Sequence, residues 1–169
     1  MGGGSEAFET SEPSEPAEPT QMVRVLVLAS ILWPSVLAVT VWQRAHGRAM
    51  VWTTGVYVTC SHLCHQRPER SFHSGATPWP VCARCSGLYL AAPFGALAAA
   101  GSLRRRVAAR RRLMWLAVAS VPTALTLGGE WTGIAASSNL TRALTALPVG
   151  IMVAFILVRT AAGEPQAIE

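Results

Sequence analysis

The sequence predicts an all-α, polytopic integral membrane protein, a helical bundle with four to five transmembrane helices. Hydrophobic residues make up 51% of the 169 residues and charged residues only 14%, against about 25% charged in ordinary soluble domains. The apolar residues also gather in long runs, separated by short segments that carry arginine. This is the pattern of helices that cross a lipid bilayer.

The apolar runs predict the helices in order. We interpret residues 22–42, 86–103, 113–127 and 143–158 as transmembrane helices. Residues 49–63 are a shorter apolar stretch, which predicts either a short crossing or an interfacial helix. In the run 86–103 small residues recur at every fourth position, a spacing that lets another helix approach closely unless it is an accident of alanine-rich composition. These residues are Gly87, Ala91, Gly95 and Ala99.

Three segments follow from this pattern: a tail of residues 1–21, a transmembrane domain of residues 22–159 and a C-terminal tail of residues 160–169. We expect the first tail to be disordered, because its Pro, Ser and Glu residues bury too little apolar surface to offset the entropy of ordering. Its start lacks the basic residues of a secretory signal, so we expect the first apolar run to be retained.

Charge predicts the orientation in the membrane. All 14 basic residues are arginines, and six of them lie in the nine-residue loop 104–112. A soluble protein this basic would be a candidate for nucleic-acid binding, but arginine-rich loops between apolar runs follow the positive-inside rule of membrane proteins. We therefore expect the protein to lie in the lipid bilayer of the cell membrane and to bind no nucleic acid. We expect the loop 104–112 to be cytoplasmic, and the segment one helix earlier to be extracytoplasmic.

That earlier segment, residues 60–89, contains every cysteine of the chain and three of its four histidines. Thiolates and imidazoles bind soft metals, and paired thiols exchange disulfides. Their concentration between two apolar runs therefore predicts a functional site.

Two stretches of this segment resemble a known signature. They read Cys64-His-Gln-Arg-Pro-Glu-Arg-Ser-Phe72 and Pro80-Val-Cys-Ala-Arg-Cys-Ser-Gly-Leu-Tyr89. They are similar to the pattern CHQRPxRSF followed by CARCxGxY, which marks an uncharacterised family of bacterial and archaeal membrane proteins, a domain of unknown function. The resemblance covers about residues 55–155 and implies membrane location and a site, but no activity. Besides the cysteines, it implies roles for Arg67, Arg70, Ser71, Arg84, Gly87, Glu130 and Arg142.

We favour a metal site, of the zinc type, in a structural or metal-handling role. Cys64, His65, Cys82 and Cys85 have the ligand types of a zinc centre, with one Cys-x-x-Cys pair. Adjacent residues such as Cys64 and His65 seldom ligate one ion together, so Cys60 or His73 is an alternative fourth ligand. Nearby arginines would offset the charge of several thiolates.

Two other interpretations remain open, and a third is disfavoured. The pairs Cys60/Cys64 and Cys82/Cys85 could pass a disulfide between them and hand electrons to a quinone, which would make the protein a quinone-linked thiol–disulfide oxidoreductase. The same pairs could form plain structural disulfides. Cys60 to His65 is one residue longer than a covalent haem attachment motif, so we do not expect haem. Sequence alone does not decide whether the protein is an enzyme.

One carboxylate lies close to an apolar run. Glu130 follows the run 113–127, and ionisable groups within a membrane are functional candidates with a partner nearby. We expect that partner to be Arg142 or an arginine of the cysteine motif, unless Glu130 lies in the interfacial layer beside Trp131.

Overall fold

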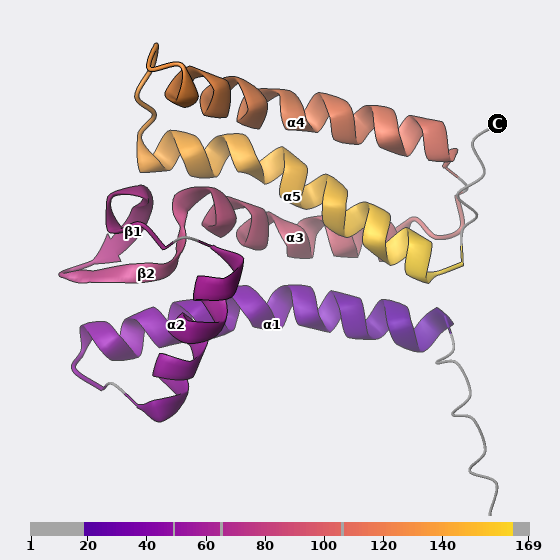
Figure 1. Ribbon diagram of the computed structural model, residues 1–169. Helices are drawn as coiled ribbons and strands as arrows, with labels where there is room; N and C mark the ends of the chain where they lie inside the picture. The colour runs from indigo at the N-terminus through magenta and orange to yellow at the C-terminus, as the bar shows by residue number, and fades with distance from the viewer. Residues whose placement is uncertain (1–18, 49, 65, 106, 164–169) are drawn as a thin grey trace, which may run out of the picture.

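Four long helices, α1, α3, α4 and α5, lie side by side in the computed structural model (Figure 1), which describes residues 19–48, 50–64, 66–105 and 107–163. They cover Pro19–Ala45, Ala83–Gly101, Ala109–Trp131 and Asn139–Ala161, and a shorter helix, α2, covers Val51–Leu63. Each long helix begins three or four residues before the apolar run that predicted it. The all-α prediction is confirmed for the bundle, and one small hairpin is added to it.

Three helices of the described chain are long and apolar enough to cross a membrane: Gln21–Ala45, Ala109–Trp131 and Asn139–Ala161. The 13 residues of α2 span about 20 Å at the rise of an α-helix, less than the hydrocarbon core of about 30 Å. This length argues against a crossing by residues 49–63. The predicted number of four to five spans remains a prediction, and a fourth would be the 19-residue α3.

The outside of the bundle carries large apolar side chains. Leu28, Phe94 and Leu125 are 58%, 68% and 70% exposed. On α4 the described chain buries only Ala109 and Arg112. Soluble monomers rarely expose contiguous apolar surface on this scale, so the bundle is built to contact lipid.

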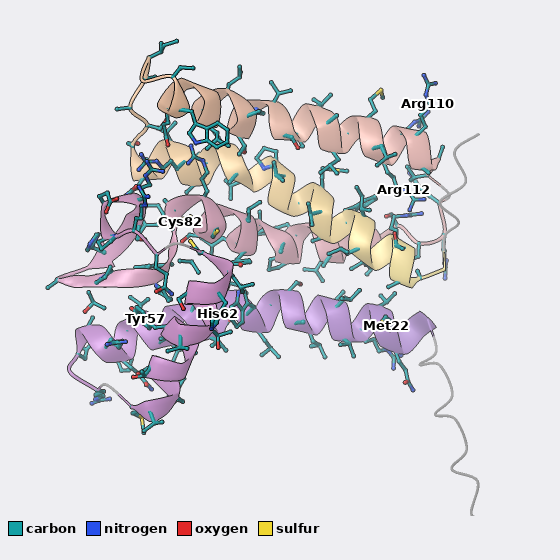
Figure 2. The ribbon with its side chains drawn as sticks, viewed as in Figure 1. Met22, Tyr57, His62, Cys82, Arg110 and Arg112 are labelled. Carbon is teal, nitrogen blue, oxygen red and sulfur yellow. The ribbon has the colours of Figure 1, made fainter. Side chains whose placement is uncertain are left out.

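The cysteine motif and the arginine-rich loop lie at opposite ends of the bundle. α1 and α4 run in one direction, and α3 and α5 run in the other (Figure 1). Figure 2 shows Met22, Arg110 and Arg112 at one end, and Tyr57 and Cys82 toward the other. The start of α1 therefore shares an end with the arginine-rich loop.

Small residues bring α3 and α5 into close contact. A Cβ added at Gly87 would overlap the carbonyl group of Ala143, and one added at Gly95 would overlap that of Ile151. From the other side, a Cβ at Gly150 would overlap the carbonyl group of Leu88. The stripe of small residues is thus the contact face of α3, as the four-residue spacing predicted, and it sets the backbone separation of the two helices.

A hairpin connects the two halves of the cysteine motif, and the sequence did not predict it. Strands β1 (Ser71–Ser74) and β2 (Thr77–Cys82) pair antiparallel, after a 3-10 turn at Pro68–Arg70. Gly75 takes a φ of +61° in the connecting turn, a conformation that glycine adopts without strain. The register pairs Ser71 with Cys82, so the hairpin returns the chain from the first half of the motif to the second.

Side chains of α2 and the following loop hold this hairpin in place. The Tyr57 hydroxyl donates to the carbonyl oxygen of Pro78 at 2.6 Å. The Gln66 amide donates to the carbonyl oxygens of Tyr57 and Pro80, at 2.7 and 2.8 Å. Helix α2 and strand β2 are therefore joined through one glutamine beside the cysteine site.

Candidate metal centre

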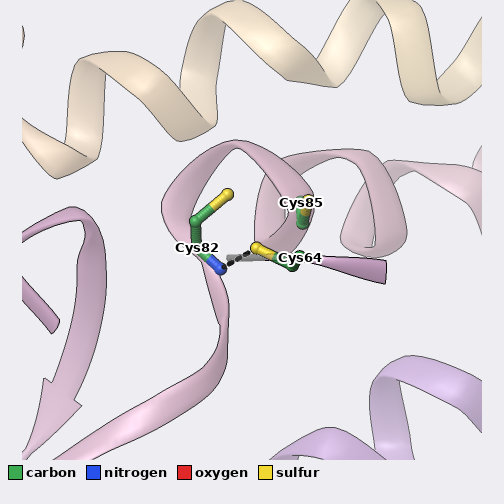
Figure 3. Close-up of side chains that lie close together, drawn as sticks. All are labelled: Cys64, Cys82 and Cys85. Atoms are coloured by element: carbon green, nitrogen blue, oxygen red, sulfur yellow. Dashed lines mark hydrogen bonds between the residues drawn. The ribbon is translucent and has the colours of Figure 1, made fainter. Parts of the chain in front are cut away.

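Three cysteines converge where α2, β2 and α3 meet (Figure 3). Cys64 caps the C-terminus of α2, Cys82 ends β2 and caps the N-terminus of α3, and Cys85 lies in the first turn of α3. Their Sγ atoms all lie within 4.8 Å of one another. None of the four cysteines of the chain forms a disulfide.

The backbone positions these sulfurs for a negatively charged state. The backbone N–H of Cys82 donates to Sγ of Cys64 at 3.3 Å. Cys82 and Cys85 lie at the N-terminus of α3, where the helix dipole stabilises a thiolate. A hydrogen bond from the Cys85 thiol lowers the pKa of Cys82 to about 5. Cys82 is therefore a thiolate at neutral pH.

The geometry fits a metal ion with soft ligands. Tetrahedral zinc with bonds of about 2.3 Å to sulfur separates its sulfur ligands by about 3.8 Å. The three Sγ atoms, within 4.8 Å of one another, would each move by less than about 1 Å to reach that arrangement. Three thiolates leave a fourth position for another ligand.

Only part of the predicted ligand set is found among the described residues. Cys64, Cys82 and Cys85 come together, whereas His65 lies outside the described residues. Cys60 and His73 do not belong to the converging group. Cys60 is fully buried in an apolar cluster with Leu37 and Val81, and burial raises the pKa of its thiol. Cys60 is therefore a core residue, and it forms no disulfide with Cys64 in the structure.

A cavity of about 480 Å³ opens beside the three sulfurs. Besides the cysteines, its lining consists of four arginines and three other side chains. The arginines are Arg67, Arg70, Arg84 and Arg142, and the other residues are Leu63, Gln66 and Trp131. Positive charge from three parts of the chain thus surrounds the space next to the sulfurs.

Glu130 joins two of these arginines. Its carboxylate accepts hydrogen bonds from Arg84 at 3.0 and 3.3 Å and from Arg142 at 2.9 Å. The side chains are only 6%, 15% and 12% exposed, for Glu130, Arg84 and Arg142. This buried ion pair connects the ends of α3, α4 and α5 at the edge of the cysteine site.

The network continues to the hairpin. Arg142 donates to Oδ1 of Asn139 at 2.8 Å, and Nδ2 of Asn139 donates to the carbonyl oxygen of Ser71 at 2.9 Å. Ser71 is fully buried, and its hydroxyl donates to the carbonyl oxygen of Arg67 at 3.1 Å. Of the motif residues named from the sequence, only Gly87 stands apart, because it packs against α5.

The geometry agrees with comparisons to known proteins. The family model described as "Predicted membrane protein (DUF2085)" matches residues 64–156, more than half of the chain. The chain belongs to this family. A similar protein is an uncharacterized protein of Methanothermobacter thermautotrophicus, 36% identical over 95 residues, which cover 56% of this chain and 84% of that protein. No solved structure matches the chain.

Membership in the DUF2085 family agrees with the membrane location. It also agrees with the difference between Cys60, which lies in the core, and the three cysteines that converge. The matched segment begins at Cys64, so it contains the three converging cysteines and omits Cys60. It also contains Glu130 and Arg142. The family is described only as a predicted membrane protein, and this description names no activity.

Sequence reasoning missed three residues that build the site. Gln66, with a φ of 46°, connects α2 to β2, Asn139 connects α5 to the hairpin, and Trp131 lines the cavity. Asn139 directly follows the residue that caps α5, Ser138, which accepts a hydrogen bond from the Thr141 N–H at 3.1 Å. No local pattern distinguishes an amide that bonds to a distant carbonyl from one that is solvated.

Proposed function

We propose that this membrane protein binds a zinc ion through Cys64, Cys82 and Cys85, in a structural or metal-handling role. The observation that carries the proposal is the convergence of three Sγ atoms within 4.8 Å of one another. Thiolates select soft or borderline ions such as zinc. Three protein ligands with a cavity at the fourth position are typical of zinc sites that admit a further ligand.

The surroundings of the sulfurs support this assignment. Three thiolates and a divalent ion carry one net negative charge, and the four arginines that line the cavity would offset it. The ion would also tie the end of α2 to the start of α3, so its binding energy would stabilise the fold. The redox alternative has no comparable support, since Cys60 is buried in an apolar cluster and is not one of the three converging sulfurs.

The metal site is proposed to face the extracytoplasmic side of the cell membrane. The arginine-rich loop lies at the opposite end of the bundle (Figure 2), and such short basic loops stay in the cytoplasm. Single cysteines at Ala76, in the hairpin turn, and at Arg110 test this orientation. In intact cells a membrane-impermeant maleimide should add label to Ala76→Cys and none to Arg110→Cys, and the reverse result would contradict the orientation.

Metal analysis of the full chain purified in detergent tests the metal site. We expect about one zinc per chain, as for a single mononuclear site. Cys82→Ser should lose zinc, whereas the matched variant Cys60→Ala should retain it, because Cys60 lies in the apolar core. Protein without metal, in which mass spectrometry finds a Cys82–Cys85 disulfide, would overturn the proposal and favour disulfide chemistry.

A further inference from the structure

We propose that the arginine-lined cavity binds a phosphate group beside the three cysteines. The ligand would be a phosphate-bearing molecule, either soluble or a lipid headgroup. The cavity has a volume of about 480 Å³, within the range of roughly 300–1,000 Å³ that is usual for small-molecule sites. This proposal concerns what the site holds in addition to the metal.

The first observation is the number and origin of the arginines. Arg67 and Arg70 come from the turn before the hairpin, Arg84 from α3 and Arg142 from α5. Guanidinium groups bind phosphate through paired N–H donors in a fixed planar geometry. Four arginines from three parts of the chain line one cavity, which is more positive charge than solubility alone would require.

The second observation is the balance of charge, which takes the proposed zinc site as given. Glu130 pairs with Arg84 and Arg142, so four guanidinium groups and one carboxylate leave three positive charges. Zinc with three thiolates contributes one negative charge, which leaves a surplus of two. A phosphate dianion matches this surplus, whereas a carboxylate would leave it half compensated.

The third observation is the supply of free donors. Among the described residues no carboxylate forms an ion pair with Arg67 or Arg70. The Nε of Arg84 is buried and has no hydrogen-bond partner within the described chain. Buried donors without a partner are rare in native proteins, and an oxygen of a bound phosphate would satisfy this one.

The remaining lining indicates that the phosphate is attached to a larger molecule. A lone phosphate ion fills only a small part of the cavity, and Leu63 and Trp131 contribute apolar surface to it. Both side chains are mostly exposed, at 63% and 78%. They would contact the group that carries the phosphate.

Calorimetry on the full chain tests the proposal in two settings. In the first setting, zinc-loaded protein in detergent is titrated with inorganic phosphate. In the second, the thermal stability of the protein is compared in phosphatidylcholine nanodiscs with and without phosphatidic acid. We expect binding in at least one setting, and the setting distinguishes a soluble ligand from a headgroup. Arg67→Gln/Arg70→Gln should weaken binding by at least about tenfold. The control Arg110→Gln/Arg111→Gln removes two exposed arginines from the first turn of α4 and should leave the affinity unchanged.

The zinc content of the same samples separates the two proposals. Zinc-loaded protein that binds phosphate in neither setting overturns the phosphate site and leaves the metal site standing. Equal affinity in Arg67→Gln/Arg70→Gln, or binding of acetate as tight as that of phosphate, also overturns it. Arginine-dependent phosphate binding by protein that lacks zinc supports the phosphate site and refutes the metal proposal.

Discussion

The buried ion pair of Glu130 offers the sharpest test of how the site is held together. Glu130→Gln keeps the size of the side chain and one carbonyl oxygen, but it removes the negative charge that Arg84 and Arg142 share. The carboxylate is 6% exposed and accepts hydrogen bonds from these two arginines at 2.9, 3.0 and 3.3 Å. Two guanidinium groups would therefore stay buried without their counter-charge.

The magnitude follows from this burial. Removing one partner of a buried ion pair destabilises a protein by about 3–5 kcal/mol, because the remaining charge is uncompensated. Since glutamine retains one acceptor, we expect a loss at the lower end, about 3 kcal/mol in the free energy of unfolding. The effect should reach three helices, because Glu130 lies on α4, Arg84 on α3 and Arg142 on α5.

Equilibrium unfolding of the detergent-purified protein, followed by circular dichroism, measures this loss. The matched control is Glu69→Gln, because Glu69 is exposed on the turn before the hairpin and should change stability by no more than about 0.5 kcal/mol. A double-mutant cycle with Arg142→Gln isolates the pair. If Glu130→Gln unfolds within about 0.5 kcal/mol of the unaltered protein, the ion pair does not hold the ends of the helices together.

Further predictions concern helix packing, thiol chemistry and metal removal. Gly95→Ala should destabilise the bundle, since the added Cβ overlaps the carbonyl group of Ile151, whereas the control Gly101→Ala meets no atom within 4 Å; thermal unfolding compares the two. In chelator-treated protein at pH 6, Cys82 should react with iodoacetamide, because a pKa of about 5 makes it mostly thiolate at pH 6. The buried Cys60 should stay unmodified, and peptide mass spectrometry measures both. Chelation should also speed amide hydrogen exchange in residues 71–82, and unchanged exchange would show that no metal supports the hairpin.

Sequence patterns found the bundle because hydrophobic runs are local. They could not predict that Cys64 joins the converging sulfurs while Cys60 does not, because this depends on where α2 ends. The helix stops at Leu63, and Cys64 turns to extended backbone, with φ −146° and ψ 140°. One residue beyond the helix, its sulfur reaches Cys82 instead of the face that carries Cys60.

The hairpin was missed for a different reason. Pro78 and Pro80 interrupt β2, and proline lacks the N–H that a central strand would need. In a two-stranded sheet each strand has one edge that pairs with no other strand. A residue on that edge needs no N–H donor, so proline is tolerated there. Gln66 and Asn139 were missed because their partners lie 14 and 68 residues away along the chain, a distance that no local pattern reports.

The arginines at the cysteine end run against the positive-inside rule, and their contacts explain why they are there. Arg44 stacks on the Tyr57 ring and Arg48 on the Trp42 ring, with guanidinium carbons 4.4 and 5.6 Å from the ring centroids. Arg84 and Arg142 pair with Glu130. Each of these four contacts an aromatic ring or a carboxylate within the chain. Arg67 and Arg70 line the cavity beside the sulfurs and form no ion pair with a carboxylate of the described residues, which is why the test of the phosphate site changes these two arginines.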